Sequence, residues 1–230
     1  MCCIISDEPI QDPTGRIKTA ETEIKFQTGM IDAPCSHCPT GCLWFLAQAN
    51  PFTCICAQYF LRRKALKGDM SKYVCFQGYI SCCCIQPGNM GEQSCPDLCL
   101  CIESCLCNSL AVSATRNYVM DQYGLSSDPC DYRIIRFNNF MQCLDCFCTI
   151  LACFCDEIRP LARLVDRIAD VVYCVVSGCM TAQVAIEMDY QISRPDESVK
   201  AYPVQPSGVY YADTPNYGYV PPGAPAGKVV

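Results

Sequence analysis

The stretch from Cys82 to Cys107 constrains the fold and chemistry of this chain more than any other. It reads CCCIQPGNMGEQSCPDLCLCIESCLC, and eight of these residues are cysteine. A hydrophobic core does not need so much sulfur, because Leu or Val buries more apolar area per residue. The density therefore indicates a chemical role. Three remain open: thiolates that bind a metal, disulfides, or thioesters that carry fatty acids.

The expected compartment narrows these three roles. The N-terminal sequence MCCIISDEPIQDPTGRIK has neither a basic n-region nor a long apolar h-region, so no signal peptide is predicted. A cytosolic chain keeps its thiols reduced, which disfavours disulfides. The net charge of −6 argues against a nucleic-acid surface, and no nucleic-acid partner is expected. Because His37 is the single histidine, a zinc site would consist almost purely of cysteine.

Cysteine spacing predicts zinc ligands in two parts of the chain. The first is Cys35-x2-Cys38, followed by Cys42, where the two-residue gap lets two sulfurs reach one tetrahedral ion. The second is the dense stretch, where cysteines recur at i, i+4 on opposite faces of a predicted helix. Cysteines that simply replace alanine in a core remain the alternative. The predicted zinc ligands are Cys35, Cys38, Cys42, Cys82, Cys83, Cys84, Cys95, Cys99, Cys101, Cys105 and Cys107.

Hydrophobic periodicity and capping residues predict a mainly α fold, a small cysteine-rich helical bundle with long loops. Asn50-Pro51 and Asp128-Pro129 each have the form of a helix start, with a capping side chain before proline. The predicted helices span 52–67, 97–123, 131–155 and 157–190. An extended N-terminal arm (1–33), the helical domain (34–191) and a disordered Pro/Tyr-rich tail (192–230) complete the predicted organisation.

The apolar run 137–155 is the nearest approach to a membrane span. It is polar at its start and contains Asp145, so it does not read as a conventional transmembrane helix. It is expected to lie in a membrane interface, to enter the membrane part way, or to form a buried core helix. Asp145 is the candidate residue for ion transport, because acidic groups within membrane segments tend to be functional.

Two other groups of residues are candidates for lipid contact. The vicinal Cys2 and Cys3 could accept acyl chains, although unmodified thiols explain them equally well. Arg62, Arg63 and Lys64 crowd one helix end, where they could meet anionic headgroups. A solvated helix end that complements the helix dipole is the alternative.

Several sequence features resemble the placenta-specific 8 (PLAC8) cysteine-rich family. They are the run Cys82-Cys83-Cys84, the Cys95-Pro96 step, and the terminal Cys179-x3-Gln183-x3-Glu187. The family's CCxxxxCPC core is absent as such, since a longer Pro/Gly loop precedes Cys95 and Leu98 precedes Cys99; the chain resembles a divergent subgroup. The resemblance implies a small, membrane-associated, often non-enzymatic protein, with metal-ion handling and growth control among the roles suggested for relatives.

The sequence thus predicts a non-enzymatic structural or interaction protein on the cytoplasmic side of a membrane, stabilised by cysteine–zinc sites. It has no phosphate loop, GxSxG or HExxH motif. Tyrosines beside prolines in 198–230 are expected to dock on a protein partner, with a solubilising tail as the alternative. A homo-oligomer or membership of a larger complex is also expected. The alternative function is metal-ion transport, efflux or a channel formed by an oligomer.

Overall fold

The computed structural model describes residues 24–80, 87–88 and 90–193. Within these residues the predicted mainly α class is confirmed: the only β contact is an isolated bridge between Lys25 and Ser126. The predictions for residues 1–23, including Cys2 and Cys3, and for the tail after Ser193 lie outside the described residues. The α-helices are α1 (Ala33–Ser36), α2 (Thr40–Ala49), α3 (Cys54–Ala65), α4 (Pro96–Leu106), α5 (Asn108–Tyr123), α6 (Pro129–Phe154) and α7 (Arg159–Ser193). The short 3-10 helices are η1 (Met70–Lys72), η2 (Cys75–Gly78) and η3 (Asp156–Ile158).

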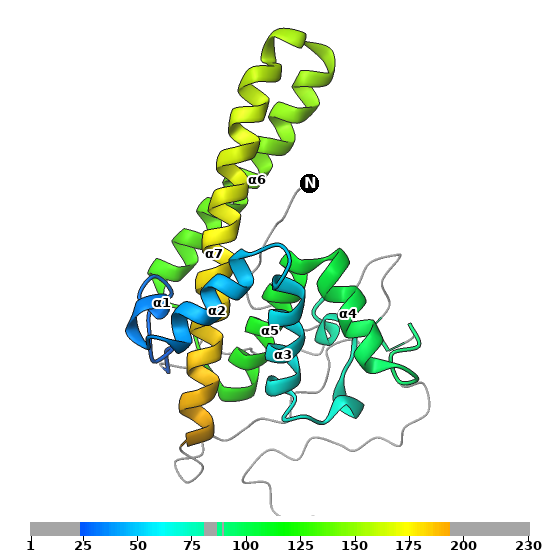
Figure 1. The fold of residues 1–230 in the computed structure, drawn as a ribbon, viewed down its shortest axis with the longest axis vertical. Helices are drawn as coiled ribbons and strands as arrows, with labels where there is room; N and C mark the ends of the chain where they lie inside the picture. The colour runs from blue at the N-terminus through cyan, green and yellow to red at the C-terminus, as the bar shows by residue number, and fades with distance from the viewer. Residues whose placement is uncertain (1–23, 81–86, 89, 194–230) are drawn as a thin grey trace, which may run out of the picture.

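The molecule consists of a helical body and one long helical hairpin that projects from it (Figure 1). The hairpin is the antiparallel pair α6 and α7, joined through η3. We call residues 137–175 the arm, and the other described residues the body. The C-terminal part of α7 returns into the body, where it packs against α1, α2, α3 and α5. The same helix α7 therefore supports both parts.

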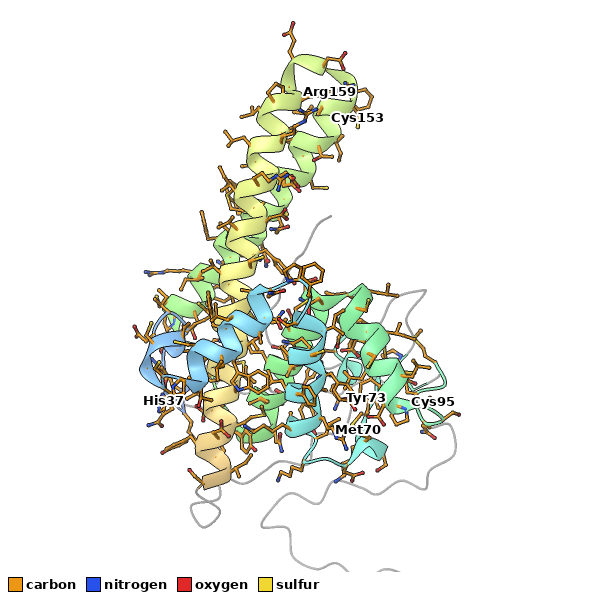
Figure 2. The ribbon with its side chains drawn as sticks, in the orientation of Figure 1. His37, Met70, Tyr73, Cys95, Cys153 and Arg159 are labelled. Atoms are coloured by element: carbon orange, nitrogen blue, oxygen red, sulfur yellow. The ribbon has the colours of Figure 1, made fainter. Side chains whose placement is uncertain are left out.

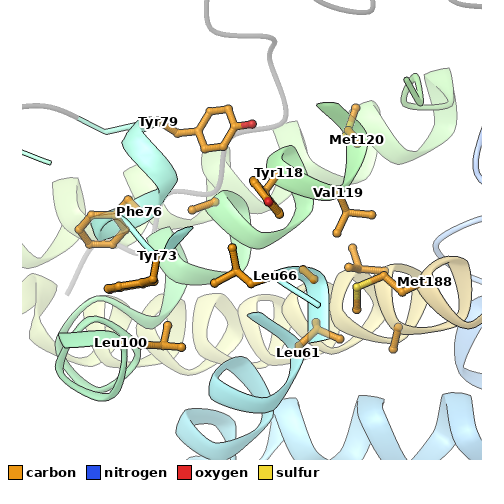
Figure 3. Close-up of a cluster of buried hydrophobic side chains, with 14 of the residues drawn as sticks. Leu61, Leu66, Tyr73, Phe76, Tyr79, Leu100, Tyr118, Val119, Met120 and Met188 are labelled. Atoms are coloured by element: carbon orange, nitrogen blue, oxygen red, sulfur yellow. The ribbon is translucent and has the colours of Figure 1, made fainter. Parts of the chain in front are cut away.

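A hydrophobic cluster at the centre of the body joins five elements (Figure 3). Leu61 and Leu66 come from α3 and the residue that caps it, Val119 from α5 and Met188 from α7, and each is at most 2% exposed. The cluster is completed by Tyr73 and Phe76 around η2 and by Leu100 of α4, each at most 2% exposed. Burying side chains of this size supplies most of the stabilisation of the body.

Arg62 of α3 lies inside this body and not on its surface. Its side chain is 0% exposed, and its Nη2 lies 3.2 Å from Oε1 of Glu103. Arg62 also donates through Nε to the Thr115 hydroxyl and through Nη2 to the Ala111 carbonyl, both at 3.0 Å. The expectation that Arg62 contacts lipid is therefore wrong, because a carboxylate 41 residues away in sequence holds it in the core.

A second buried ion pair attaches the N-terminal segment to the body. Arg116 of α5 lies 3.4 Å from Asp131 of α6, and Asp131 also accepts from the backbone N–H of Met30 at 3.1 Å. Met30 is 1% exposed and Phe26 is 7% exposed. Residues 24–33, the end of the predicted N-terminal arm, thus pack as part of the body.

The helix boundaries differ from the predicted ones in three places. The predicted helix 97–123 is two helices, α4 and α5, bent by 119° at Cys107. α3 begins at Cys54 because Asn50 forms a turn first, its Oδ1 accepting from the Phe52 N–H at 2.8 Å. The third is α2, which lies outside the predicted helices and begins two residues after the predicted zinc ligand Cys38; Gly41 there packs so tightly that a Cβ would lie 2.3 Å from the Ala33 carbonyl oxygen.

Candidate functional site

The outward face of α6 along the arm is apolar and uncovered. Its large side chains are each more than half exposed, and between Arg136 and Asp156 the only charged residue is Asp145, which is 4% exposed. A helix in a water-soluble hairpin normally turns its apolar stripe inward. This face thus presents to the surroundings what a soluble hairpin would bury. The side chains that form it are Phe137, Phe140, Phe147, Ile150 and Phe154.

The inward face of α6 is polar where it meets α7. Asn138, Gln142 and Asp145 are buried there, and Gln142 Nε2 donates to the carbonyl of Ala169 at 2.9 Å. Ala162 and Ala169 are the buried residues of α7 on this seam, and their small size allows close approach of the two helices. Asn138 Oδ1 and Asp145 Oδ1 have no hydrogen-bond partner among the described residues. The arm thus buries these polar side chains of α6 together with Met141 and Cys148, and it leaves an apolar face on the outer side of α6.

Helix α7 carries two different exposed faces along the arm. One face is charged, with Arg163, Arg167 and Asp170 exposed and Asp166 half-buried. The other face is apolar and exposed, and consists of Leu161, Leu164, Ile168, Val171 and Val175. Along the arm, α7 thus exposes both a charged face and an apolar face, whereas the exposed face of α6 is apolar.

Two helical segments are long and apolar enough to cross a membrane by length and composition: α6, and 156–193, which contains α7. Their environments differ. In the most apolar window of α6 only 28% of the residues are buried, whereas in that of 156–193 the share is 67%. The most apolar window of 156–193 is therefore mainly a core helix of the body, whereas that of α6 is mostly exposed. The bent pair α4 and α5 also passes the same test as a broken span.

The predicted zinc ligands that the structure describes fall on opposite sides of the body (Figure 2). The first group flanks His37 between α1 and α2, and the second begins at Cys95 before α4. No group of three or more His, Cys, Asp or Glu side chains within the described ranges converges as metal ligands do. Cys82, Cys83 and Cys84 lie outside the described residues. The remaining thiols of the second group, which are free, are Cys95, Cys99, Cys101, Cys105 and Cys107.

The closest thiol contact in the first group joins Cys38 and Cys42. Their sulfur atoms lie 3.8 Å apart, and Cys42 Sγ also donates to the Pro34 carbonyl at 2.8 Å. The hydrogen bond with Cys38, burial and the nearby Cys35 thiol raise the pKa of the Cys42 thiol. The sequence pattern emphasised the pair Cys35 and Cys38, whereas the contact is between residues four apart. Cys38 precedes α2 and Cys42 lies in its first turn, so no helical periodicity of the sequence indicated this contact.

The predicted basic lipid-contact residues do not form one surface patch. Arg62 is buried, and the ammonium of Lys64 forms an ion pair with Asp189 of α7. Arg63 remains exposed and donates to the Tyr59 hydroxyl at 3.3 Å. The strongest candidate for a membrane contact is therefore the arm, not this helix end.

Comparison with protein-family models, with curated proteins and with solved structures finds no match for this chain. The resemblance to the PLAC8 family stays a prediction from the quoted motifs. What the protein does has to be inferred from its own geometry.

Proposed function

We propose that this chain is a non-enzymatic, membrane-associated protein whose arm lies in the membrane–water interface while the body stays on the cytoplasmic side. The observation that supports this most directly is the outer face of α6, with large apolar side chains outside and Asn138, Gln142 and Asp145 inside. A face of this kind is stabilised by contact with acyl chains and destabilised by contact with water.

The size of the exposed face supports reversible membrane binding. Burying a Phe or Ile side chain fully stabilises by about 1.5–3 kcal/mol, so five side chains that are more than half exposed contribute roughly 5 kcal/mol or more. A single myristoyl chain binds with a constant of about 10⁴ M⁻¹, or roughly 5.5 kcal/mol. The arm alone is therefore comparable with one lipid anchor, and further contacts add to it.

The charged face of α7 favours an arm in the membrane plane over one that crosses the bilayer. Arg163, Asp166, Arg167 and Asp170 would all enter the hydrocarbon core of a spanning arm. Each such charge costs about 2.5–3.5 kcal/mol at the bilayer centre, so four exceed the gain from the outer face of α6. An arm in the plane keeps these charges at the level of water and headgroups.

Flotation of the purified full chain with phosphatidylcholine vesicles, with and without phosphatidylserine, tests this proposal. We expect Phe140→Ser with Phe147→Ser to remove most of the flotation. The matched control is Phe52→Ser with Phe60→Ser, which changes two phenylalanines that are exposed on the body, at 87% and 59%. Flotation of the arm variant at the level of the unchanged chain would contradict a role of the arm.

Cysteine–zinc sites are the second part of the proposal. The 3.8 Å between Cys38 Sγ and Cys42 Sγ equals the edge of a tetrahedron with Zn–S bonds of about 2.3 Å. The fit is partial, because the described residues bring no third ligand to this point. We expect metal analysis of the purified chain to find at least one zinc ion, and Cys38→Ser with Cys42→Ser to lose it. Changing two exposed thiols elsewhere, Cys56→Ser with Cys130→Ser, is the control.

A second candidate function is ion transport by an oligomer, and one observation favours it. The Asp145 carboxylate is buried in the seam of the arm, and its Oδ1 has no partner among the described residues. Burying an unpaired carboxylate oxygen costs folding free energy, and a functional role would explain why the residue is kept. Extraction of membranes with alkaline carbonate discriminates between the two functions: a transporter stays in the membrane pellet, whereas an interfacial arm is released.

A further inference from the structure

The charged face of α7 holds four charges that no other part of the described chain neutralises. Arg163, Asp166, Arg167 and Asp170 form no ion pair within the described ranges. The neighbouring Arg159 differs, because its Nη2 lies 2.7 Å from Asp156. The charged residues of α7 within the arm that lack an ion pair in the described ranges therefore lie in its middle.

The order of these charges brings no net stabilisation to a single helix, because two opposite pairs three residues apart, Arg163 with Asp166 and Arg167 with Asp170, offset two like pairs four residues apart. Residues four apart on a helix face each other, and like charges at that spacing destabilise it. Arg163 and Arg167 are one such pair, and Asp166 and Asp170 are another.

The same order is self-complementary in an antiparallel pair of helices. In a pair centred between positions 166 and 167, Arg163 lies opposite Asp170 of the second copy. Asp166 then lies opposite Arg167 of the second copy, and the two-fold axis repeats both contacts. A parallel pair would instead place each charge opposite its like. We propose that the charged face of α7 is the contact surface for a second copy of this chain, with the two arms antiparallel.

The length of the arm fits this arrangement. From the centre of the pair to the turn at Asp156 is about 16 Å at a rise of 1.5 Å per residue, and from the centre to Val176, where α7 is buried in the body, is about 14 Å. The tip of one arm therefore reaches the start of the other body. A two-fold axis perpendicular to the membrane keeps the outer α6 faces of both copies on the same side, as binding to one membrane requires.

This inference rests on the proposed membrane binding. Exposed ion pairs in water contribute little, and four of them do not offset the freedom lost on association. At a membrane the arms are already confined to a plane. The charges there are partly removed from bulk water, and their attraction is stronger than in bulk water. The pair therefore forms on the membrane and not in dilute solution.

Charge reversal with complementation tests the contact on vesicles. Arg163→Asp with Arg167→Asp makes the face wholly acidic, and Asp166→Arg with Asp170→Arg makes it wholly basic. We use the full chain with a fluorescent donor or acceptor fused at its C-terminal end, on phosphatidylcholine vesicles. The unchanged chain should show energy transfer, each variant alone should lose it, and the mixture of the two variants should regain it. Arg163→Lys with Arg167→Lys keeps the charges and should keep the transfer.

Every outcome of this experiment either supports or overturns the contact between the two arms. Transfer by either variant alone at the unchanged level, or no recovery in the mixture, overturns the contact. Flotation is measured on the same samples, because none of these variants alters the outer face of α6. Flotation without energy transfer overturns the pairing alone, whereas loss of flotation by the unchanged chain overturns the membrane binding and, with it, the pairing.

Discussion

Arg62 Nη2 lies 3.2 Å from Glu103 Oε1, and both side chains are 0% exposed. The other oxygen of Glu103 accepts from the Tyr73 hydroxyl at 2.8 Å and from the backbone N–H of Phe76 at 2.7 Å. One carboxylate thus connects α3, α4 and the segment between them. Several donors surround the carboxylate, but Arg62 Nη1 is buried with no hydrogen-bond partner among the described residues, so the pair offsets only part of the hydration lost on burial.

Removal of this carboxylate should destabilise the body strongly. Glu103→Ala leaves the Arg62 guanidinium buried and uncompensated, which costs about 3–5 kcal/mol in free energy of unfolding. Glu157→Ala at the exposed turn of the arm is the control and should change it by less than about 0.5 kcal/mol. Urea denaturation followed by circular dichroism measures both. A loss below about 1 kcal/mol for Glu103→Ala would mean that water or a counterion replaces the carboxylate.

Gly178 should be intolerant of a side chain because α2 packs directly on it. A Cβ at Gly178 would lie 2.7 Å from Cδ2 and 3.1 Å from the carbonyl oxygen of Phe45. We expect Gly178→Ala to lower the free energy of unfolding by about 1–3 kcal/mol, as overpacking does. The control is Gly29→Ala, whose Cβ would meet only Asp32 Oδ2, at 3.4 Å. Equal thermal stability of the two variants would show that Phe45 moves aside freely.

The sequence predicted most of the helical segments, without α2 and without the break between α4 and α5, but not what the helices bury, and Arg62 shows why. Local patterns assign a basic residue at a helix end to the surface, since charged side chains are rarely buried without a partner. The partner is Glu103, which no local window contains. The bend at Cys107 is similar: the segment from Pro96 to Tyr123 has no internal breaker, and tertiary contacts of α4 and α5 override its helix propensity.

For the same reason, the sequence predicts which residues of the arm are apolar or charged, but not which of its faces are exposed. The apolar run 137–155 and the charged residues of α7 are both visible in the sequence. Whether an apolar helix face is core or surface depends on whether another helix covers it, and the sequence does not state this. The contact of Gln142 with Ala169 in the structure shows which side of α6 faces α7, and therefore which side is the exposed outer face.

Stability should fall at alkaline pH because a thiol and two tyrosines in the body resist ionisation. Burial, with Glu103 and Glu92 nearby, raises the pKa of the Cys75 thiol from 9.0 to about 12, and burial also raises the pKa of Tyr73 and Tyr79 above 10.0. Above pH 9.0 the unfolded chain loses the Cys75 proton while the folded chain keeps it, so ionisation favours unfolding. This contribution to stability is complete below pH 9.0 and declines up to about pH 12.

Urea midpoints measured on both sides of pH 9.0 check this expectation. Cys75→Ala should weaken the alkaline decline, and the two tyrosines should leave part of it in place. Cys101→Ser, at an exposed thiol of α4, is the control and should leave the decline unchanged. A decline that is independent of Cys75 would assign it to the other buried groups with a raised pKa, which include Tyr73, Tyr79 and Cys179.

Two buried aspartates on α6 should respond to the same substitution in opposite directions. Asp131 accepts from Met30 N–H, from Gln183 Nε2 at 2.8 Å and from Arg116, so Asp131→Ala should lower the free energy of unfolding by about 3–5 kcal/mol. Asp145 is similarly buried, but its Oδ1 has no partner and it forms no ion pair within the described ranges. Asp145→Ala removes the cost of burying that carboxylate and improves helix propensity, so it should raise the free energy of unfolding by about 1 kcal/mol. Urea denaturation of both variants under the same conditions measures the difference in sign. A strong destabilisation by Asp145→Ala would show that this carboxylate has a stabilising partner, and the argument for ion transport would lose its observation.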